Sequence, residues 1–201
     1  MNSQRFERGY LPEEYVNNLR NYRSLVKQLM KEAQATDDHV EALRSSKERF
    51  VAPVRATMMT EDWCGDSACN TPVLTQLFEA AEIDFRVFRG SEEEELKAMY
   101  ESEGDDHIPV VSVWDGKGRE LLRWIEAPES VRRKKNEWKA SRPEFTELYE
   151  MKEEDKEAAK RFASLYREFL ETMAGWYKSG DWTETTGEVA ELLEEKAAGE
   201  K

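Results

Sequence analysis

Residues 54–124 alternate between short apolar runs and longer stretches with helical spacing, and this order constrains the fold more than any other feature of the chain. We expect four β-strands, at residues 54–59, 83–88, 110–114 and 120–124. Helices are expected over 66–82 and after Ser91, and Asp115-Gly116-Lys117-Gly118 between the last two strands indicates a β-hairpin. The order β-α-β-α-β-β therefore predicts an α/β fold with a mixed sheet flanked by helices, in which two parallel strands precede an antiparallel hairpin.

Helical patterns flank this segment at both ends. Apolar residues recur every three or four positions from Leu11 to Ala33, which predicts one long helix, and a shorter helix is expected after Asp38. The chain from Pro143 onwards is also helical in pattern, with a break expected over 180–187. We therefore expect an N-terminal helical extension (1–50), an α/β domain (51–142) and a C-terminal helical extension (143–201) that packs on this domain.

Charge and cysteine content narrow the classes of function. The formal net charge is −13, which disfavours nonspecific binding to nucleic acids and attraction to anionic membrane surfaces. Two cysteines are too few for a disulfide scaffold, and with only two histidines no metal site is expected. No apolar run approaches the roughly 20 residues of a membrane helix. These features predict a cytoplasmic protein without a cofactor and without a nucleic-acid or membrane partner.

Cys64 lies where the first predicted strand gives way to a helix. The thiolate is the nucleophilic form of cysteine, and the unpaired amides and partial positive charge of a helix N-terminus favour it. Trp63 would shield the sulfur on one side. The position therefore suggests a reactive thiol, and an inert, packed cysteine is the alternative interpretation.

Several motifs around Cys64 resemble those of thioredoxins. Trp63-Cys64-Gly65-Asp66-Ser67 is similar to their Trp-Cys-Gly-Pro-Cys segment, and Pro72 matches the proline in their active-site helix. Ile108-Pro109 is similar to the Ile-Pro dipeptide whose cis bond flanks the thioredoxin active site. The resemblance covers residues 51–140 and implies a thioredoxin-like fold. The Trp-Cys-Gly-Asp motif with added terminal helices resembles, more narrowly, a bacterial branch that often keeps only the first cysteine.

The resemblance also implies roles for individual residues. Cys64 would be the nucleophile, Ser67 could hydrogen-bond its thiolate, and Pro109 would present backbone to an extended substrate. The residues implied in substrate binding are Trp63, Gly65, Asp66 and Ile108.

Three departures from the thioredoxin pattern bear on activity. Ser67 stands where thioredoxins have their second active-site cysteine, and Met58 stands where they have a buried aspartate. Asp66 replaces the proline between the two cysteines. Its negative charge is expected to oppose thiolate formation at Cys64.

Cys69 is the only other thiol that could serve as a partner for Cys64. Residues five apart on an ideal helix have Cα atoms about 8.6 Å apart and point about 140° away from each other. A disulfide needs a Cα separation below about 7 Å. We therefore expect Cys69 to be a packed helix residue, with a role as second thiol as the alternative.

These observations lead to competing hypotheses about function. The first is a thiol–disulfide oxidoreductase of monothiol type, in which Cys64 attacks a protein disulfide or a low-molecular-weight thiol adduct and forms a mixed disulfide. The second is a redox-inactive thioredoxin-fold module that binds a protein partner. A third is a homodimer built on the C-terminal helices. His107 is either a proton carrier near the thiol or a solvated loop residue.

Overall fold

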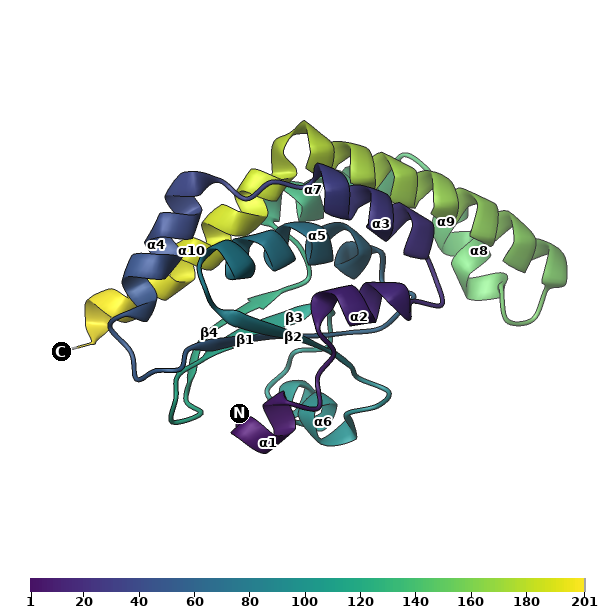
Figure 1. The fold of residues 1–201 in the computed structure, drawn as a ribbon. Coiled ribbons are helices and arrows are strands. Elements are labelled where there is room, and N and C mark those ends of the chain that lie inside the picture. The colour runs from purple at the N-terminus through teal and green to yellow at the C-terminus, as the bar shows by residue number, and fades with distance from the viewer. Residues whose placement is uncertain (201) are drawn as a thin grey trace. The chain divides into compact units, whose positions relative to one another are not determined.

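The computed structural model describes residues 1–200, and its centre is a four-stranded mixed sheet with helices on both faces (Figure 1). The strands are β1 (Arg55–Thr60), β2 (Asp84–Arg89), β3 (Val110–Trp114) and β4 (Glu120–Ile125). Their order is β2-β1-β3-β4, with β1 and β2 parallel and the other two pairs antiparallel. The predicted fold class is therefore confirmed.

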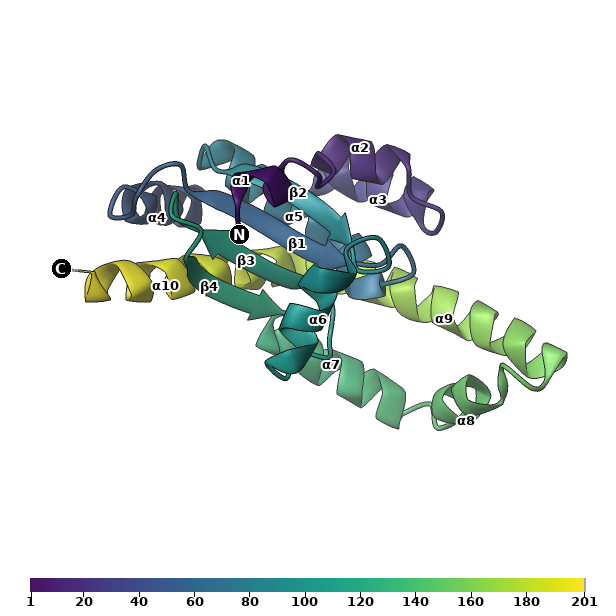
Figure 2. The ribbon, with the colours of Figure 1, turned by 90° about the horizontal axis from the view of Figure 1, so that it is seen from below.

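Alternation along β1 divides its side chains between two packed layers. Met59 lies beside Phe88 and Val110 in a core that includes Leu96 and Tyr100 of α6 (Glu94–Ser102). Figure 2 shows this face of the sheet, with α1 (Ser3–Phe6) and α6 in front of the strands. The opposite face carries Met58 and Thr60 and packs against α5 (Gly65–Ala80).

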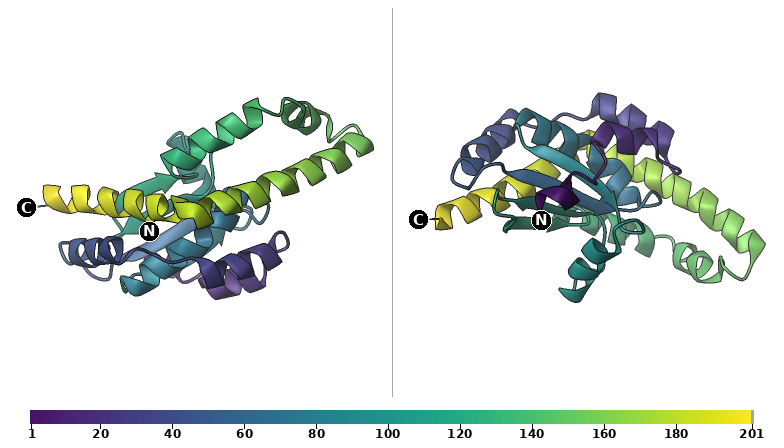
Figure 3. Two further views of the ribbon diagram at one scale, coloured as in Figure 1. Left: turned by 90° about the horizontal axis from the view of Figure 1, so that it is seen from above. Right: turned by 60° about the horizontal axis from the view of Figure 1, so that its bottom comes forward.

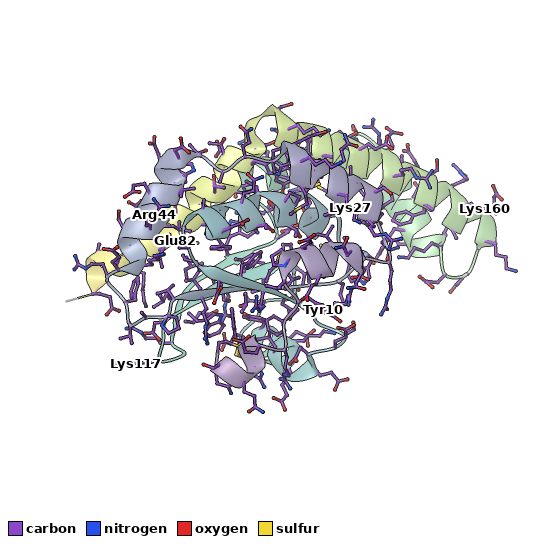
Figure 4. All side chains as sticks on the ribbon, in the orientation of Figure 1. Tyr10, Lys27, Arg44, Glu82, Lys117 and Lys160 are labelled. Carbon is purple, nitrogen blue, oxygen red and sulfur yellow. The ribbon has the colours of Figure 1, made fainter. Side chains whose placement is uncertain are left out.

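The hairpin between β3 and β4 forms where its sequence predicts it. The Asp115 carboxylate accepts hydrogen bonds of 2.9 Å from the backbone N–H groups of Lys117 and Arg119. Gly118 has a φ of 79°, a left-handed conformation that glycine adopts without strain. Lys117 marks this turn in Figure 4.

The predicted long helix from Leu11 to Ala33 is wrong, because the structure divides it into α2 (Pro12–Asn17) and α3 (Arg23–Glu32). The intervening backbone bonds to other parts of the chain. The Asn18 carbonyl accepts from the Arg89 side chain at 3.2 Å, and the Arg20 N–H donates to Asp62 at 3.2 Å. These contacts replace bonds that a continuous helix would make internally.

Two further elements complete the N-terminal part of the chain. Tyr10, labelled in Figure 4, forms a short antiparallel bridge with Val87 on the outer edge of β2. The helix expected after Asp38 is α4 (Asp37–Lys47).

The last helix, α10 (Trp182–Gly199), begins within the break expected over 180–187. A π-helical turn (Tyr177–Asp181) precedes α10, and Gly180 within it has a non-helical backbone with a φ of 137°. Helix α10 lies beside α4 (Figure 3, left) and also packs against α5 and β4. Its threonines are bonded to these neighbours: Thr185 donates to Asn70 Oδ1, and Thr186 contacts His39 Nδ1, each at 2.8 Å. This packing explains why the segment is helical although its sequence pattern is weak.

The contacts divide the described chain into two compact units. The first contains residues 1–127 and 182–200, and the second residues 128–181. The second unit consists of α7 (Glu129–Ala140), α8 (Glu144–Met151), α9 (Lys156–Trp176) and a π-helical turn (Tyr177–Asp181). An aromatic cluster holds its helices together, formed by Trp138, Phe145, Phe162, Tyr166 and Phe169. The predicted division after residues 50 and 142 is a different one and stays a prediction.

Within residues 1–200, every helix is too short or too polar to cross a membrane.

Asp62 and Arg89 form a buried ion pair that also bonds the backbone between α2 and α3. We expect removal of this ion pair to destabilise the fold. Arg89→Ala would remove the buried cation 2.7 Å from Asp62 and leave it the exposed, more distant Arg20 side chain (3.8 Å), at a cost of up to about 3–5 kcal/mol in the free energy of unfolding. Urea denaturation measures this change. Arg86→Ala is the matched control, because Arg86 is on the same strand but forms its ion pair with the exposed Glu7. Equal destabilisation by the two substitutions would contradict the role given to the buried pair.

Candidate functional site

Cys64 caps the N-terminus of α5. Its backbone is extended, its carbonyl accepts from the Ala68 N–H at 3.1 Å, and its Sγ accepts from the Ser67 N–H at 3.4 Å. A side chain that accepts from the first turn is the usual way to satisfy an unpaired helix amide. The sulfur therefore lies directly on the N-terminal amides of α5.

The loop before β3 approaches the same sulfur from another side. The Cys64 thiol donates a hydrogen bond to the Ile108 carbonyl, with 3.4 Å between Sγ and O. The Ile108–Pro109 peptide bond is cis. The structure thus brings together Cys64, Ser67, Ile108 and Pro109, four of the residues that the sequence analysis selected.

Trp63 and Cys64 differ sharply in exposure. The Trp63 side chain is 60% exposed, whereas Cys64 is only 6% exposed. A pocket of about 410 Å³ opens beside Trp63 and Ile108, and Thr60, Glu61, Gly90 and Lys97 are among its other lining residues. The arrangement offers an open aromatic surface and a pocket next to a nearly covered sulfur.

Burial dominates the electrostatics of the thiol. It raises the pKa of Cys64 to about 11, and the negative charge of Asp66 acts in the same direction. Hydrogen bonds from Ser67 lower the pKa but do not outweigh these effects. Cys64 is consequently a protonated thiol at neutral pH, which agrees with its hydrogen bond to Ile108.

The other residues of the motif shape the first turn of α5. Gly65 is buried and Asp66 is partly exposed. Met58, at the position of the thioredoxin aspartate, lies next to Thr71, with 4.0 Å between Sδ and Oγ1. A methionine has no proton to exchange, so this position supplies no acid or base.

Cys69 does not join Cys64. Both cysteines are free thiols, and Cys69 is fully buried in α5. Its carbonyl accepts a hydrogen bond of 2.9 Å from the Trp182 indole of α10. This environment is that of a packing residue.

His107 lies near the site in sequence but faces solvent. Its side chain is 62% exposed, and Nδ1 lies 2.5 Å from the Asp106 carboxylate. No hydrogen bond in the described part of the chain joins it to Cys64.

The sequence analysis missed an ion pair at the edge of this site. Asp62, two residues before Cys64, bonds Arg89 at 2.7 Å, and their side chains are 7% and 5% exposed. The Arg89 guanidinium also lies over the rings of Tyr10 and Tyr15. A signal was available, because Arg89 ends an apolar strand and Asp62 adjoins the cysteine motif.

Residues 1–200 contain no cluster of three or more His, Cys, Asp or Glu side chains that could hold a metal ion.

Comparison with known proteins gives a family match and several solved structures of similar fold. The model of a family described as "Thioredoxin" matches residues 9–139. A protein of unknown function from Pseudomonas aeruginosa has a TM-score of 0.58 at 18% identity, over 97% of this chain and 99% of its own. An HIV epitope scaffold has a TM-score of 0.60 at 16% identity, over 96% and 97%. At these identities the two structures support the fold alone. No curated protein matches the sequence.

The burial of Cys64 predicts a distinctive pH dependence of its alkylation. In a Cys69→Ala variant, the rate with iodoacetamide is expected to rise about tenfold per pH unit from about pH 7 to about pH 10, because only the thiolate reacts. Mass spectrometry of timed samples measures this rate, with the variant lacking both cysteines as a blank. A rate that levels off near pH 8.5, as for an ordinary thiol, would contradict the assigned pKa.

Proposed function

Since the chain belongs to this thioredoxin family, we propose that it is a thiol–disulfide oxidoreductase that uses Cys64 as its single nucleophile. The observation that carries the proposal is the position of Sγ, which contacts the α5 amides on one side and the loop of the cis Ile108–Pro109 bond on the other. We also assign the chain to the branch with a Trp-Cys-Gly-Asp motif and added terminal helices, as its sequence suggests.

The reaction proceeds in two exchanges. Cys64 loses its proton, and the thiolate attacks one sulfur of a disulfide R–S–S–R′. A Cys64–S–S–R bond forms, the original S–S bond breaks, and the departing R′S⁻ takes up a proton. An external thiol then attacks the mixed disulfide as its thiolate, forms a new disulfide with R, and releases Cys64. Ser67 has no thiol, so the second step depends on this external thiol.

The surroundings of Cys64 indicate how each residue contributes. The Ser67 N–H lies against Sγ and would stabilise its negative charge. Trp63 and the pocket beside Ile108 offer contact surface to a protein or small-molecule disulfide. Because the resting pKa is near 11, the exchange rate is expected to increase with pH through the neutral range.

A second function is favoured by one specific observation. The Cys64 thiol is 6% exposed and donates to Ile108, which is also the geometry of a structural cysteine that holds two loops together. In that case the pocket beside Trp63 and Ile108 would bind a protein partner without redox chemistry. Formation of a mixed disulfide distinguishes the two functions.

Incubation with glutathione disulfide tests the proposal directly. Intact-mass spectrometry should show one glutathione adduct, removable by excess dithiothreitol, on the wild-type chain and on Cys69→Ser. Cys64→Ser should show none, because the nucleophile is gone while the buried Cys69 stays inaccessible. Absence of any adduct at about pH 9, or adducts lost equally in both variants, would rule out a single nucleophile at Cys64.

A further inference from the structure

A second hydroxyl lies behind Ser67. Ser67 is 1% exposed, and its Oγ accepts a hydrogen bond from Thr60, the fully buried last residue of β1. A hydroxyl has one hydrogen to donate and two lone pairs to accept with. The Thr60 hydroxyl also lies 3.3 Å from the Glu61 carbonyl, but Ser67 Oγ is the nearer acceptor. With Thr60 donating to Ser67, the Ser67 hydrogen is left for another acceptor, and a Ser67 side-chain hydrogen bond is among the contacts that lower the pKa of Cys64.

Strand geometry explains why Thr60 is at this point. Side chains alternate along β1, so Thr60 shares the face of Met58, which packs against α5. As the last residue of the strand, Thr60 reaches the first turn of α5, where Ser67 lies one turn after Cys64. The placement therefore follows from the β1–α5 junction itself.

The N-terminal helix α2 contributes a third hydroxyl. Tyr15 is 2% exposed, and a hydrogen bond with Thr60 is one of the contacts that act on its phenol. Burial and the nearby Asp62 charge raise the pKa of Tyr15 well above its usual value, so the phenol stays protonated. The Arg89 guanidinium lies 5.4 Å from the Tyr15 ring.

We propose that Thr60 is a positioning residue for Cys64, and that with Tyr15 behind it the Thr60 hydroxyl aims the Ser67 hydroxyl at Sγ. The proposal rests on the proposed function, since it concerns the thiolate that would attack a disulfide. The chain of hydroxyls runs from α2 through β1 to the start of α5. It assigns a role at the thiol to two residues outside the Trp-Cys-Gly-Asp motif.

The chain of hydroxyls matters because Sγ changes its hydrogen-bonding role when the thiol loses its proton. The thiol donates to the Ile108 carbonyl, whereas the thiolate can only accept. The thiolate then depends on the Ser67 N–H and the Ser67 hydroxyl as donors. Hydrogen bonds in a buried series polarise one another, so Thr60 strengthens the donation from Ser67. The proton of the thiol leaves to solvent, and the three hydroxyls keep theirs.

Two substitutions at Thr60 separate its hydroxyl from its shape. In the Cys69→Ala background, Thr60→Val keeps the shape and loses the hydroxyl, whereas Thr60→Ser keeps the hydroxyl and loses a methyl group. Loss of one hydrogen bond in the series should slow alkylation of Cys64 at pH 8 by about threefold to tenfold in Thr60→Val. Thr60→Ser should stay within about twofold of the parent.

A purely structural role gives the opposite pattern and would overturn the proposal. Thr60→Val would then react like the parent, and Thr60→Ser would differ through lost packing. Circular dichroism and urea denaturation establish that each variant is folded. If Thr60→Val does not fold, Thr60→Ala replaces it, with slower alkylation than in Thr60→Ser expected and equal rates in these two variants as the contrary result.

Tyr15→Phe tests the Tyr15 end of the chain of hydroxyls. It should slow alkylation in the same direction by a smaller factor, and no change would exclude Tyr15 from the proposal. Tyr100→Phe is the matched control, because it removes an equally buried phenol that bonds Ser112 on the other face of the sheet. An equal effect of both tyrosine substitutions would contradict the proposal.

The alkylation rate does not depend on disulfide chemistry. A slower rate in Thr60→Val together with no glutathione adduct on the wild-type chain would leave the positioning role in place and reject the oxidoreductase. An adduct on the wild-type chain with no effect of Thr60→Val would support the oxidoreductase and reject the positioning role of Thr60.

Discussion

The buried ion pair between Asp62 and Arg89 links the elements around the candidate site. Asp62 belongs to the loop that leads to Cys64, and Arg89 ends the edge strand β2. The same two side chains bond the backbone at Asn18 and Arg20, which turns the chain between α2 and α3. A buried charge is costly unless it is paired, so each group fixes the position of the other. The N-terminal helices are thereby joined to the cysteine loop.

The environment of Cys64 sets two physical effects against each other. The amides at the start of a helix favour a thiolate, whereas burial favours the neutral thiol. Here burial is stronger, with Asp66 adding to it, and the resting state is a thiol bonded to Ile108. Ser67 nevertheless offers donors that suit a thiolate: its N–H lies 3.4 Å from Sγ, and its side-chain hydrogen bond also lowers the pKa of Cys64. The site can therefore satisfy the hydrogen-bonding needs of either protonation state.

The sequence predicted the sheet well because its strands have clear apolar runs and its hairpin has specific turn residues. The strand from Val110 to Trp114 was predicted at its observed bounds. The long N-terminal helix was predicted wrongly because the apolar period continues through residues 18–22. The backbone of this segment instead forms hydrogen bonds with side chains that are distant in the sequence. The same limit applies to the site. The motif identified Cys64 and Ser67. Thr60, Tyr15 and Arg89 make contacts that span 7 to 74 residues of sequence, and no local pattern reveals them.

The N-terminal segment therefore does more than extend the fold, because its residues contact the surroundings of the candidate site. The Arg89 guanidinium lies over the Tyr15 ring, and the Arg20 N–H bonds the loop before Cys64, so residues outside the sheet contact the surroundings of the site. The family match begins at residue 9 and includes this segment. A thioredoxin-like domain cut at residue 51 would lose the Tyr15 hydroxyl and leave the buried faces of Asp62 and Arg89 open to water. Because burial is the largest effect on the thiol, added access of water near the site would change the pKa of Cys64, and such a fragment would not reproduce the whole chain.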